Sequence, residues 1–274
     1  MNISKLFIFS LIFLIGCQYF NNPSSIITDI PPYNPKYEGE TIKIANWNLQ
    51  IFGDLKASNS QLMAFYASVI DDYDIVFIQE IRDEDSSAYY DLCTMLDGYK
   101  CKISSRAGRS TSKEQYGVFY KKSIEVPIFF DFNNEQHKDD FERPPIRVQF
   151  VINNYSLAVY NIHIKPDDVA YEMQKLEELI SPMVKNDLNA IILGDMNAAC
   201  SYYNNDKENH FDSWRWIIKD DDDTTVSSTN CAYDRIIMND NIYNEFVDYG
   251  IYREGINKNV SDHYLVWVEV SIYD

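Results

Sequence analysis

We interpret the fold outward from one stretch, Asn189-Ala-Ile-Ile-Leu-Gly-Asp-Met-Asn-Ala-Ala-Cys200. Its apolar run, 190–193, is bounded by Gly194, which predicts a buried strand that ends at the edge of a sheet. Asp195 and Asn197 follow two positions apart, so their side chains point the same way and can hold a phosphate, a metal or a water. The alternative is an Asx-rich turn that only closes the strand. The neighbouring segments decide between these interpretations.

The composition indicates one large domain. The chain has 274 residues, is 46% hydrophobic and 15% aromatic, and contains no low-complexity block that would divide it. Such a chain can bury a sizeable core. Its 24 basic and 42 acidic residues give a formal charge of -18. This excludes a protein that grips nucleic acid through a generally basic surface, so any DNA contact must be local.

The N-terminus predicts export. Residues 1–16 contain one Lys and an apolar run from Leu6 to Ile15, which is typical of a secretory signal and too short for a comfortable membrane span. Leu14-Ile-Gly-Cys17 resembles the lipobox of bacterial lipoproteins, which implies cleavage before Cys17 and a diacylglycerol on its sulfur. The alternative is an uncleaved anchor. Residues 17–40 are polar and contain prolines, which predicts a flexible tether to a domain over 41–274 that lies outside the cytoplasm.

The remaining cysteines form an even set in an exported chain, where disulfides persist. Three pairings of Cys93, Cys101, Cys200 and Cys231 are possible. We favour Cys93 with Cys101 and Cys200 with Cys231, because the second pair lies beside two stretches that we expect to converge on one site. Reduced thiols at Cys93 and Cys101 are the alternative.

Apolar periodicity predicts more strands than helices. Helices are expected over residues 60–71, 84–96 and 169–185, the last interrupted by Pro182. Strands are expected at 41–48, 74–80, 117–120, 126–130, 146–152, 156–164, 189–194, 233–238 and 264–272, with a hairpin turn at Asn153-Asn154 and an edge strand at Pro127. Strands occur both in adjacent pairs and with helices between them. Two sheets packed face to face, with helices outside, fit this order best.

Polar or ionisable side chains recur where these strands begin or end. They are Asn48, Glu80, His163, Asp195 with Asn197, Asp234, and Asp262 with His263. Together they supply what phosphodiester hydrolysis needs, namely a base, an acid and a way to carry negative charge. His163 and His263 lie beside strands, whereas His137 and His210 lie in polar loops and are interpreted as solvated. A single histidine in such a place is usually scaffolding.

Carboxylates next to the two histidines would fix their tautomers and favour their charged forms. Glu114 and Asp234 are the candidates. Glu80 and Asn48 offer oxygen ligands to a hard cation such as Mg²⁺.

Seven segments resemble one known family. They are Ile44-Ala-Asn-Trp-Asn-Leu-Gln-Ile-Phe-Gly53, Val76-Phe-Ile-Gln-Glu-Ile-Arg-Asp83, Lys113-Glu-Gln-Tyr116, Asn161-Ile-His163, Leu193-Gly-Asp-Met-Asn-Ala-Ala-Cys-Ser-Tyr202, Ser228-Thr-Asn-Cys-Ala-Tyr-Asp-Arg-Ile236 and Ser261-Asp-His-Tyr264. On these motifs the chain is similar to the endonuclease/exonuclease/phosphatase superfamily and, within it, to the deoxyribonuclease I family. Q-E, G-D-x-N and S-D-H are general to the superfamily, whereas S-T-N-C-A-Y-D-R-I and Q-E-x-R-D are specific to deoxyribonuclease I.

The resemblance implies a four-layered α/β sandwich of two mainly antiparallel or mixed β-sheets flanked by helices. It implies that His263, oriented by Asp234, activates water, and that His163, paired with Glu114, protonates the O3′ leaving group. Mg²⁺ or Mn²⁺, or the phosphate, would be held by Asn48, Glu80, Asp195, Asn197 and Asp262.

Further implied features concern DNA and calcium. Arg82 and Arg143 fall where the family places arginines against the minor groove, with surface salt bridging as the alternative. Cys200 and Cys231 match the family's long-loop disulfide. Structural Ca²⁺ is implied at Asp223, Thr225, Ser227 and Thr229, unless that loop is only a solvated acidic one. The chain departs from its mammalian relatives at Ser112, where they carry a tyrosine.

The expected function is a lipid-anchored, monomeric, metal-dependent endonuclease that cuts double-stranded DNA to 5′-phosphorylated fragments. One alternative keeps the fold and changes the substrate, as in a sphingomyelinase or a phosphodiesterase of phosphoinositides and other small molecules. A second alternative is a non-catalytic binding lipoprotein.

Overall fold

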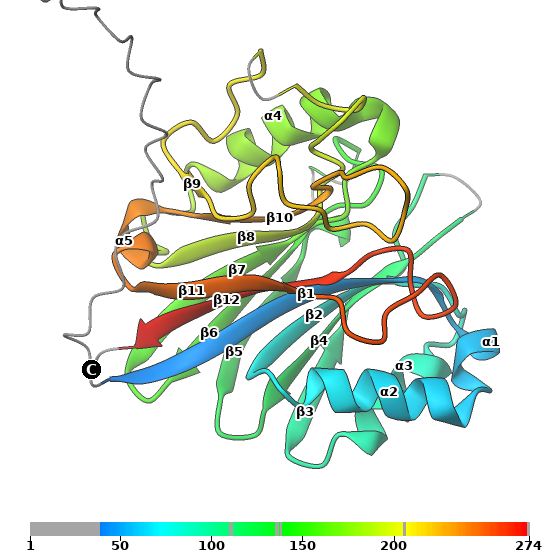
Figure 1. Ribbon diagram of the computed structural model, residues 1–274. Helices are drawn as coiled ribbons and strands as arrows, with labels where there is room; N and C mark the ends of the chain where they lie inside the picture. Colours follow the sequence, from blue (N-terminus) through cyan, green and yellow to red (C-terminus); the bar gives the residue numbers. More distant parts are fainter. Residues whose placement is uncertain (1–38, 110–111, 135–136, 138, 205–206, 273–274) are drawn as a thin grey trace, which may run out of the picture. The chain divides into compact units, whose positions relative to one another are not determined.

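The computed structural model describes residues 39–109, 112–134, 137, 139–204 and 207–272, all within one compact unit, Tyr33–Asp274. Two six-stranded sheets form its centre (Figure 1). The first has the order β11-β12-β1-β2-β4-β3, with bounds Phe246–Tyr252, Leu265–Ile272, Glu40–Phe52, Ile75–Ile81, Gln115–Lys121 and Tyr99–Ile103. The second has the order β5-β6-β7-β8-β10-β9, with bounds Glu125–Asp131, Ile146–Ile152, Tyr155–Asn161, Ala190–Asp195, Asp234–Met238 and Arg215–Trp216.

Each sheet contains one parallel pair of strands, and these pairs position the site. β1 runs parallel to β2, and β7 runs parallel to β8, whereas the other neighbours are antiparallel. A parallel connection needs a crossover, which is usually helical. Here α1 (Asp54–Ala57) and α2 (Ser60–Ile70) connect β1 to β2, and α4 (Val169–Ile180) connects β7 to β8. Both parallel pairs therefore present the carboxyl ends of their strands to a common edge.

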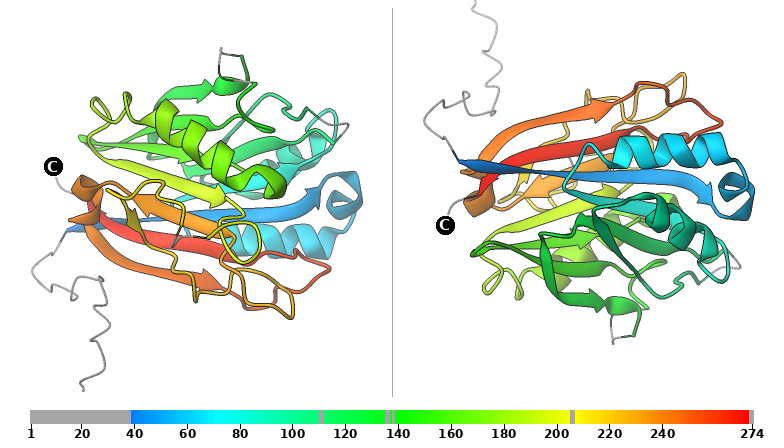
Figure 2. Two further views of the ribbon diagram at one scale, coloured as in Figure 1. Left: turned by 90° about the horizontal axis from the view of Figure 1, so that it is seen from above. Right: turned by 90° about the horizontal axis from the view of Figure 1, so that it is seen from below.

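Helices cover the outer faces of the two sheets. α2 and α3 (Ser87–Met95) pack on β1, β2 and β4 through one apolar cluster, and α4 packs on β7 and β8 through another (Figures 1 and 2). A third cluster fills the space between the sheets, where the inward residues of β2, β6 and β12 meet. The order helix, sheet, sheet, helix confirms the expected four-layered α/β sandwich.

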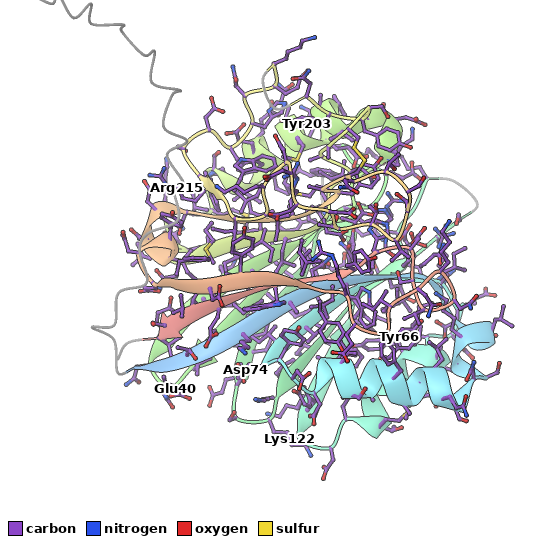
Figure 3. The ribbon with its side chains drawn as sticks, in the orientation of Figure 1. Glu40, Tyr66, Asp74, Lys122, Tyr203 and Arg215 are labelled. Carbon is purple, nitrogen blue, oxygen red and sulfur yellow. A yellow bond between two sulfur atoms is a disulfide. The ribbon has the colours of Figure 1, made fainter. Side chains whose placement is uncertain are left out.

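Aromatic side chains make much of the contact between α2 and β1. Tyr66 of α2, labelled in Figure 3, meets Trp47 of β1 edge to face, with ring centroids 5.4 Å apart. Both side chains are fully buried. Such aromatic pairs stabilise a core beyond the area that they bury. Trp47 immediately precedes Asn48, so this packing also fixes the end of β1 at the site.

Most predicted elements are present, with differences at their ends. The helix expected over 169–185 ends at Ile180, before Pro182, because proline cannot continue a helical hydrogen-bond ladder. Asn153 has a φ of 53°, as the predicted hairpin turn requires. Three strands and two short α-helices were not predicted, namely β3, β9, β11, α1 and α5 (Asp240–Tyr243).

The structure contains both expected disulfides. Cys93 of α3 pairs with Cys101 of β3, and Cys200 pairs with Cys231. The predicted signal peptide and lipidated Cys17 lie outside the described residues, as does nearly all of the predicted tether. Within the part of the chain that the structure describes, no helix combines the length and apolarity needed to cross a bilayer.

Candidate active site

The carboxyl ends of the two parallel strand pairs meet at one edge of the sheets. Asn48 lies near the end of β1, Glu80 near the end of β2, and Asp195 at the end of β8. His163 follows β7 by two residues. Asp234 opens β10 directly opposite Asp195 in the ladder. These strand ends converge because parallel neighbours end on the same side, and antiparallel neighbours begin there.

His163 is held by a buried carboxylate. Its Nδ1 lies 2.9 Å from Oε2 of Glu114, and the other oxygen of Glu114 accepts from Nη1 of Arg143 at 2.9 Å. Burial would raise the pKa of Glu114, but His163, Arg143 and Arg82 outweigh it and lower the pKa to about 2. The hydroxyl of Tyr116 accepts from the His163 backbone N–H at 3.0 Å. The ring is thus fixed with its Nε2 directed away from Glu114.

His263 has a corresponding support on the other side. Its Nδ1 lies 2.7 Å from Oδ2 of Asp234, which is fully buried. Burial alone would lower the pKa of His263, but the charges of Asp234 and Asp195 raise it to about 10. The His263 backbone is also held, since its carbonyl accepts from Nε1 of Trp47 at 3.0 Å and its N–H donates to Oγ of Ser261 at 3.0 Å.

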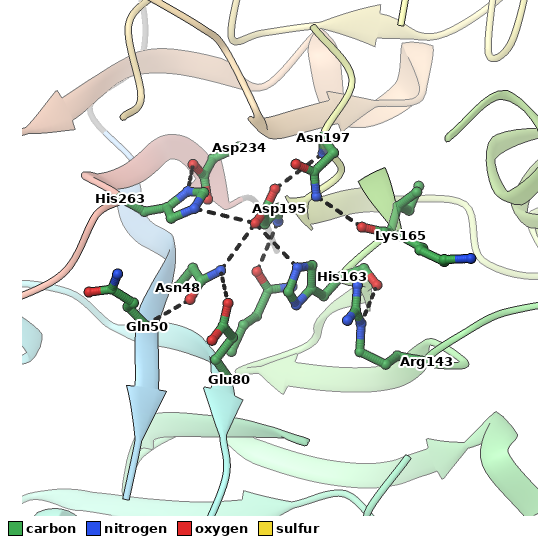
Figure 4. Close-up of polar contacts among 12 residues, drawn as sticks. Asn48, Gln50, Glu80, Arg143, His163, Lys165, Asp195, Asn197, Asp234 and His263 are labelled. Atoms are coloured by element: carbon green, nitrogen blue, oxygen red, sulfur yellow. Dashed lines mark hydrogen bonds and ion pairs between the residues drawn. The ribbon is translucent and has the colours of Figure 1, made fainter. Parts of the chain in front are cut away.

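Asp195 lies between the two imidazoles, as Figure 4 shows. Its Oδ2 is 3.4 Å from Nε2 of His163 and 3.5 Å from Nε2 of His263. Burial would raise the pKa of Asp195, but His263 and His163 outweigh it, so this pKa is lowered. The Nε2 atoms of His163 and His263 therefore approach the same oxygen of Asp195 from two sides. This is the arrangement that a proton acceptor and a proton donor need around one phosphoryl group.

Asn197 secures the loop that leaves β8. Its backbone N–H donates to Oδ1 of Asp195 at 3.2 Å, and its Nδ2 donates to the carbonyl of Ile164 at 2.9 Å. It adopts a φ of 49°, a region that asparagine tolerates better than most residues. The predicted pair Asp195 and Asn197 is therefore brought together, with Asn197 holding the Asp195 loop against the end of β7.

Carboxylate oxygens that could bind a divalent cation lie close to Asn48. Its Nδ2 donates to Oε1 of Glu80 at 3.2 Å and to Oδ2 of Asp195 at 3.1 Å. Oδ1 of Asp262 is buried, although the side chain as a whole is 45% exposed, and it lies 3.8 Å from Nε2 of His263 without a hydrogen-bond partner among the described residues. Buried carboxylate oxygens that lack donors fit a cation, since Mg²⁺ favours one or two carboxylates. The residues present therefore fit a divalent metal.

A second grouping of potential ligands, Glu80, Glu114 and His163, places one donor atom of each residue within 4.8 Å of the others. We give less weight to Glu114 and His163 as ligands. Glu114 bonds His163 and Arg143 and is only 2% exposed, whereas the Glu80 side chain is 13% exposed, although Asn48, Ile51 and Arg82 contact its oxygens. Glu80 is common to both groupings and is the strongest ligand candidate.

The two predicted DNA-binding arginines differ in exposure. Arg82 has 28% of its side chain exposed, with Nη2 3.1 Å from Oε2 of Glu80 and Nη1 donating to Oγ of Ser112 at 2.6 Å. It lies at the rim, as expected for a substrate contact. Arg143 is 11% exposed and is bonded to Glu114 and to the carbonyl of His163. Arg143 as a groove contact stays a prediction: its Nε and Nη1 bond His163 and Glu114, and its Nη2 is buried without a hydrogen-bond partner among the described residues.

The predicted calcium loop forms a cluster of oxygens. Oγ1 of Thr225 lies 3.3 Å from Oδ1 of Asp223 and 3.1 Å from Oγ of Ser227, and Ser227 contacts Oγ1 of Thr229 at 3.0 Å. The same loop is tied to the site, because the backbone N–H of Val226 donates to the Asp262 carbonyl at 2.7 Å. Changes in this loop would therefore reach the Asp262–His263 segment.

Several supporting residues were not predicted. Gln79, Tyr116, Ser261 and Lys56 all anchor the site. Lys56 donates to the carbonyls of Leu49 at 2.6 Å and Val260 at 2.8 Å, and burial lowers its pKa to about 8 against the opposing charges of Asp262 and Glu80. Gln79, Tyr116 and Ser261 lie within the quoted motifs, but no role was assigned to them, and Lys56 lies just after one. His210 was interpreted as solvated, but its side chain is 15% exposed and lies near Glu177.

Comparisons with known proteins identify the family of this chain. Residues 45–263 match the Endonuclease/Exonuclease/phosphatase family. The chain belongs to this family. Deoxyribonuclease-1 of Sus scrofa is 34% identical over 220 residues, which cover 72% of this chain and 76% of that protein. Deoxyribonuclease-1 of Bos taurus is 30% identical over 264 residues, covering 85% of this chain and 93% of that protein. The chain is thus a deoxyribonuclease-I-like family member.

Solved structures of other members share the fold. The mannosyl-6-phosphatase Bt3783 of Bacteroides thetaiotaomicron superposes with a TM-score of 0.64 at 17% identity, covering 84% of this chain and 100% of that one. A humanized TDP2 of D. rerio gives a TM-score of 0.63 at 14% identity, covering 85% and 99%. As a family member with deoxyribonuclease-1 relatives, this chain is a hydrolase of the nuclease or phosphodiesterase type, and the family generally uses divalent metal ions.

Proposed function

We propose that this protein is a metal-dependent endonuclease that hydrolyses double-stranded DNA to 5′-phosphorylated products. The observation that carries this proposal is the pair of carboxylate-backed imidazoles, His163 and His263, whose Nε2 atoms both face Asp195. The deoxyribonuclease-1 relatives support DNA as the substrate.

His263 acts as the base. Its Nδ1 proton is held by Asp234, so the lone pair of Nε2 faces the site and can accept a proton from water. In the metal-free protein the charges of Asp234 and Asp195 raise the pKa of His263 to about 10, which keeps the ring protonated at neutral pH. A divalent cation held by Asp195 would offset one of these charges and favour the neutral ring, and Asp234 would then stabilise the imidazolium that forms. Asp234 therefore orients the base and offsets the charge that the base acquires.

His163 acts as the acid. Glu114 accepts from Nδ1 and stays ionised, because its pKa is lowered to about 2, so Nε2 of His163 is left facing the site, where it can present a proton. That proton passes to the departing O3′. The phosphoryl group lies between the two rings, so water and O3′ occupy opposite sides of the phosphorus.

The metal ligands in this proposal are Glu80, Asn48, Asp195 and Asp262, with Asn197 facing the phosphate. When bound, Mg²⁺ or Mn²⁺ would supply positive charge to the phosphoryl oxygens. Ca²⁺ bound at Asp223, Thr225, Ser227 and Thr229 would stabilise the loop that is hydrogen-bonded to Asp262.

The protein contacts DNA through a few local side chains. Arg82 is the exposed cation at the rim, which suits minor-groove contact by an otherwise acidic protein with a charge of -18. Arg143 contributes through Glu114 and His163, and a rearrangement on binding would be needed for it to reach DNA. We further propose that residues 41–274 are the catalytic domain of a monomeric, extracytoplasmic lipoprotein anchored at Cys17.

The test is a plasmid-nicking assay with the full chain, in Mg²⁺ and Ca²⁺ and with or without chelator. We expect metal-dependent nicking of duplex DNA and 5′-phosphate ends. His163→Ala and His263→Ala should each lose at least about 1000-fold in kcat. His137→Ala is the matched control, because His137 lies in a loop away from the site, where it pairs with Asp140 and is 38% exposed. Turnover of sphingomyelin or inositol phosphates without DNA cleavage would overturn the proposed substrate.

A further inference from the structure

A fully buried amide, Gln79, connects the two sheets directly beneath the site. It belongs to β2 in the first sheet and precedes Glu80. Its Oε1 accepts from the backbone N–H of Asp195 at 2.8 Å, and its Nε2 donates to the carbonyl of Ile162 at 2.7 Å. Asp195 ends β8 of the second sheet, and Ile162 directly follows β7 of the same sheet. One side chain therefore spans the interface between the strands that carry Glu80, His163 and Asp195.

The peptide between Ile162 and His163 is held at both of its polar atoms. Its carbonyl accepts from Gln79, and its N–H donates to the hydroxyl of Tyr116 at 3.0 Å. Clamping both atoms fixes the peptide plane, and hence the direction in which the His163 side chain leaves the backbone. The second contact of Gln79 fixes the backbone of Asp195, whose carboxylate lies 3.4 Å from Nε2 of His163.

The contacts require an amide in one orientation. Oε1 receives a second donor, Nδ2 of Asn46, at 3.3 Å, so two N–H groups face the oxygen and one carbonyl faces the nitrogen. An apolar side chain would leave these groups buried without partners, which is destabilising. A charged carboxylate would face the Ile162 carbonyl and repel it.

Gly194 provides the space for this amide. A Cβ on Gly194 would lie 1.9 Å from the Ile162 carbonyl oxygen and 2.7 Å from Nε2 of Gln79. Its φ of 147° is also unfavourable for other residues. The glycine before Asp195 and the glutamine before Glu80 are therefore complementary parts of one inter-sheet contact.

We propose that Gln79 is a positioning residue that sets the separation of the acid His163 from Asp195 and couples both to the strand bearing Glu80. This inference rests on the proposed function for the role of His163. The contact acts on backbone atoms, so Gln79 affects the reaction through His163 and Asp195 and does not touch the substrate.

The principal variant is Gln79→Met, which keeps the length and flexibility of the side chain and removes the amide. We expect kcat for DNA nicking to fall about 10- to 100-fold with KM changed less than about threefold, as for a small misplacement of reacting groups. Tyr160→Phe is the matched control. Tyr160 lies on β7, close to His163, and donates a buried hydrogen bond to Asp187. The substitution removes this bond without touching the site. Its kcat should remain within about twofold of that of the wild type.

Gln79→Glu gives a test by rescue. A protonated carboxyl can donate to Ile162 and accept from Asp195 as the amide does, and burial favours the protonated form. We expect the activity of this variant, relative to wild type, to be higher at pH 6 than at pH 9. Gln79→Met should show no such trend. This comparison remains informative if Gln79→Met does not fold.

A readout independent of DNA separates this inference from the proposed function. Imidazole ¹⁵N resonances of His163 report its tautomer and environment whether or not the protein cleaves DNA. We expect them to move in Gln79→Met and to stay in place in Tyr160→Phe. Wild-type resonances and wild-type kcat in a folded Gln79→Met protein would overturn the positioning role. If the resonances shift in Gln79→Met but the wild-type protein cleaves no DNA, only the proposed substrate is overturned.

Discussion

Replacing Asp234 by Asn should impair the proposed base without removing it. The Asp234 carboxylate is fully buried, and its Oδ2 lies 2.7 Å from Nδ1 of His263. At that distance, two unit charges attract by about 6 kcal/mol at an effective dielectric constant of about 20. Burial of the ring offsets part of this attraction. The remainder helps to raise the pKa of His263 to about 10. Asparagine keeps the shape of the side chain but loses this charge.

We therefore expect the pKa of His263 in Asp234→Asn to fall toward its ordinary value of 6.5. The asparagine amide can also rotate to donate a hydrogen bond, which would favour the wrong tautomer of the ring. In a triad with this arrangement the same change costs about 10⁴-fold in kcat, and we expect roughly 10³- to 10⁴-fold here. The assay combines initial rates of plasmid nicking with an NMR titration of the His263 ring.

The control is Asp240→Asn, an exposed carboxylate just beyond the far end of β10 that pairs with Arg215. It should leave both the nicking rate and the titration of His263 unchanged. The reasoning fails if Asp234→Asn keeps kcat within about threefold of wild type. It also fails if the imidazole titrates as in the wild type, because the carboxylate would then have no influence on the base.

Three further predictions concern stability. In the metal-free protein, the raised pKa of His263 stabilises the fold fully below pH 6.5 and progressively less as pH rises to about 10. The difference in unfolding free energy between wild type and His263→Gln, measured by denaturant titration, should thus shrink over this range by at most about 1.4 kcal/mol per pH unit; a constant difference would contradict it. Removing Cys200 and Cys231 together, which are 31 residues apart, should cost roughly 3 to 4 kcal/mol in the same assay, whereas an unchanged midpoint would mean no stabilisation. Gly194→Ala should cost at least about 3 kcal/mol, because its Cβ would overlap the Ile162 carbonyl oxygen; a wild-type Tm would refute the close approach.

Much of the fold could be predicted because its strands are short apolar runs with clear ends. The stretch around Asp195 is the clearest case, since an apolar run stops at Gly194 and delivers Asp195 and Asn197 to the edge where the histidines lie. β11 was missed because Phe246–Tyr252 mixes aromatic residues with Asp248 and Gly250 and is only half-buried, so it shows no alternation. β3 was missed for a similar reason, since only Tyr99 in it is buried.

Site membership could be predicted better than site architecture. Residues with chemical function stand at strand ends, where the sequence shows them. Gln79 also stands there, in the Q-E motif, but its role could not be predicted, because its partners lie across the interface between the sheets. Arg143 shows the opposite difficulty. The family resemblance predicted a contact with DNA, and only the three-dimensional structure reveals that Nη1 and Nε of Arg143 also bond Glu114 and the His163 carbonyl.

The division of labour between His163 and His263 is the central claim, and one measurement tests it most directly. In a DNA substrate with sulfur in place of the bridging O3′, the leaving thiolate is weakly basic and needs no proton donor. We expect His163→Gln to be slow on normal DNA and to approach the wild-type rate on the sulfur substrate. His263→Gln should be slow on both. Equal defects of His163→Gln on the two substrates, or rescue of His263→Gln instead, would contradict the assignment of acid and base.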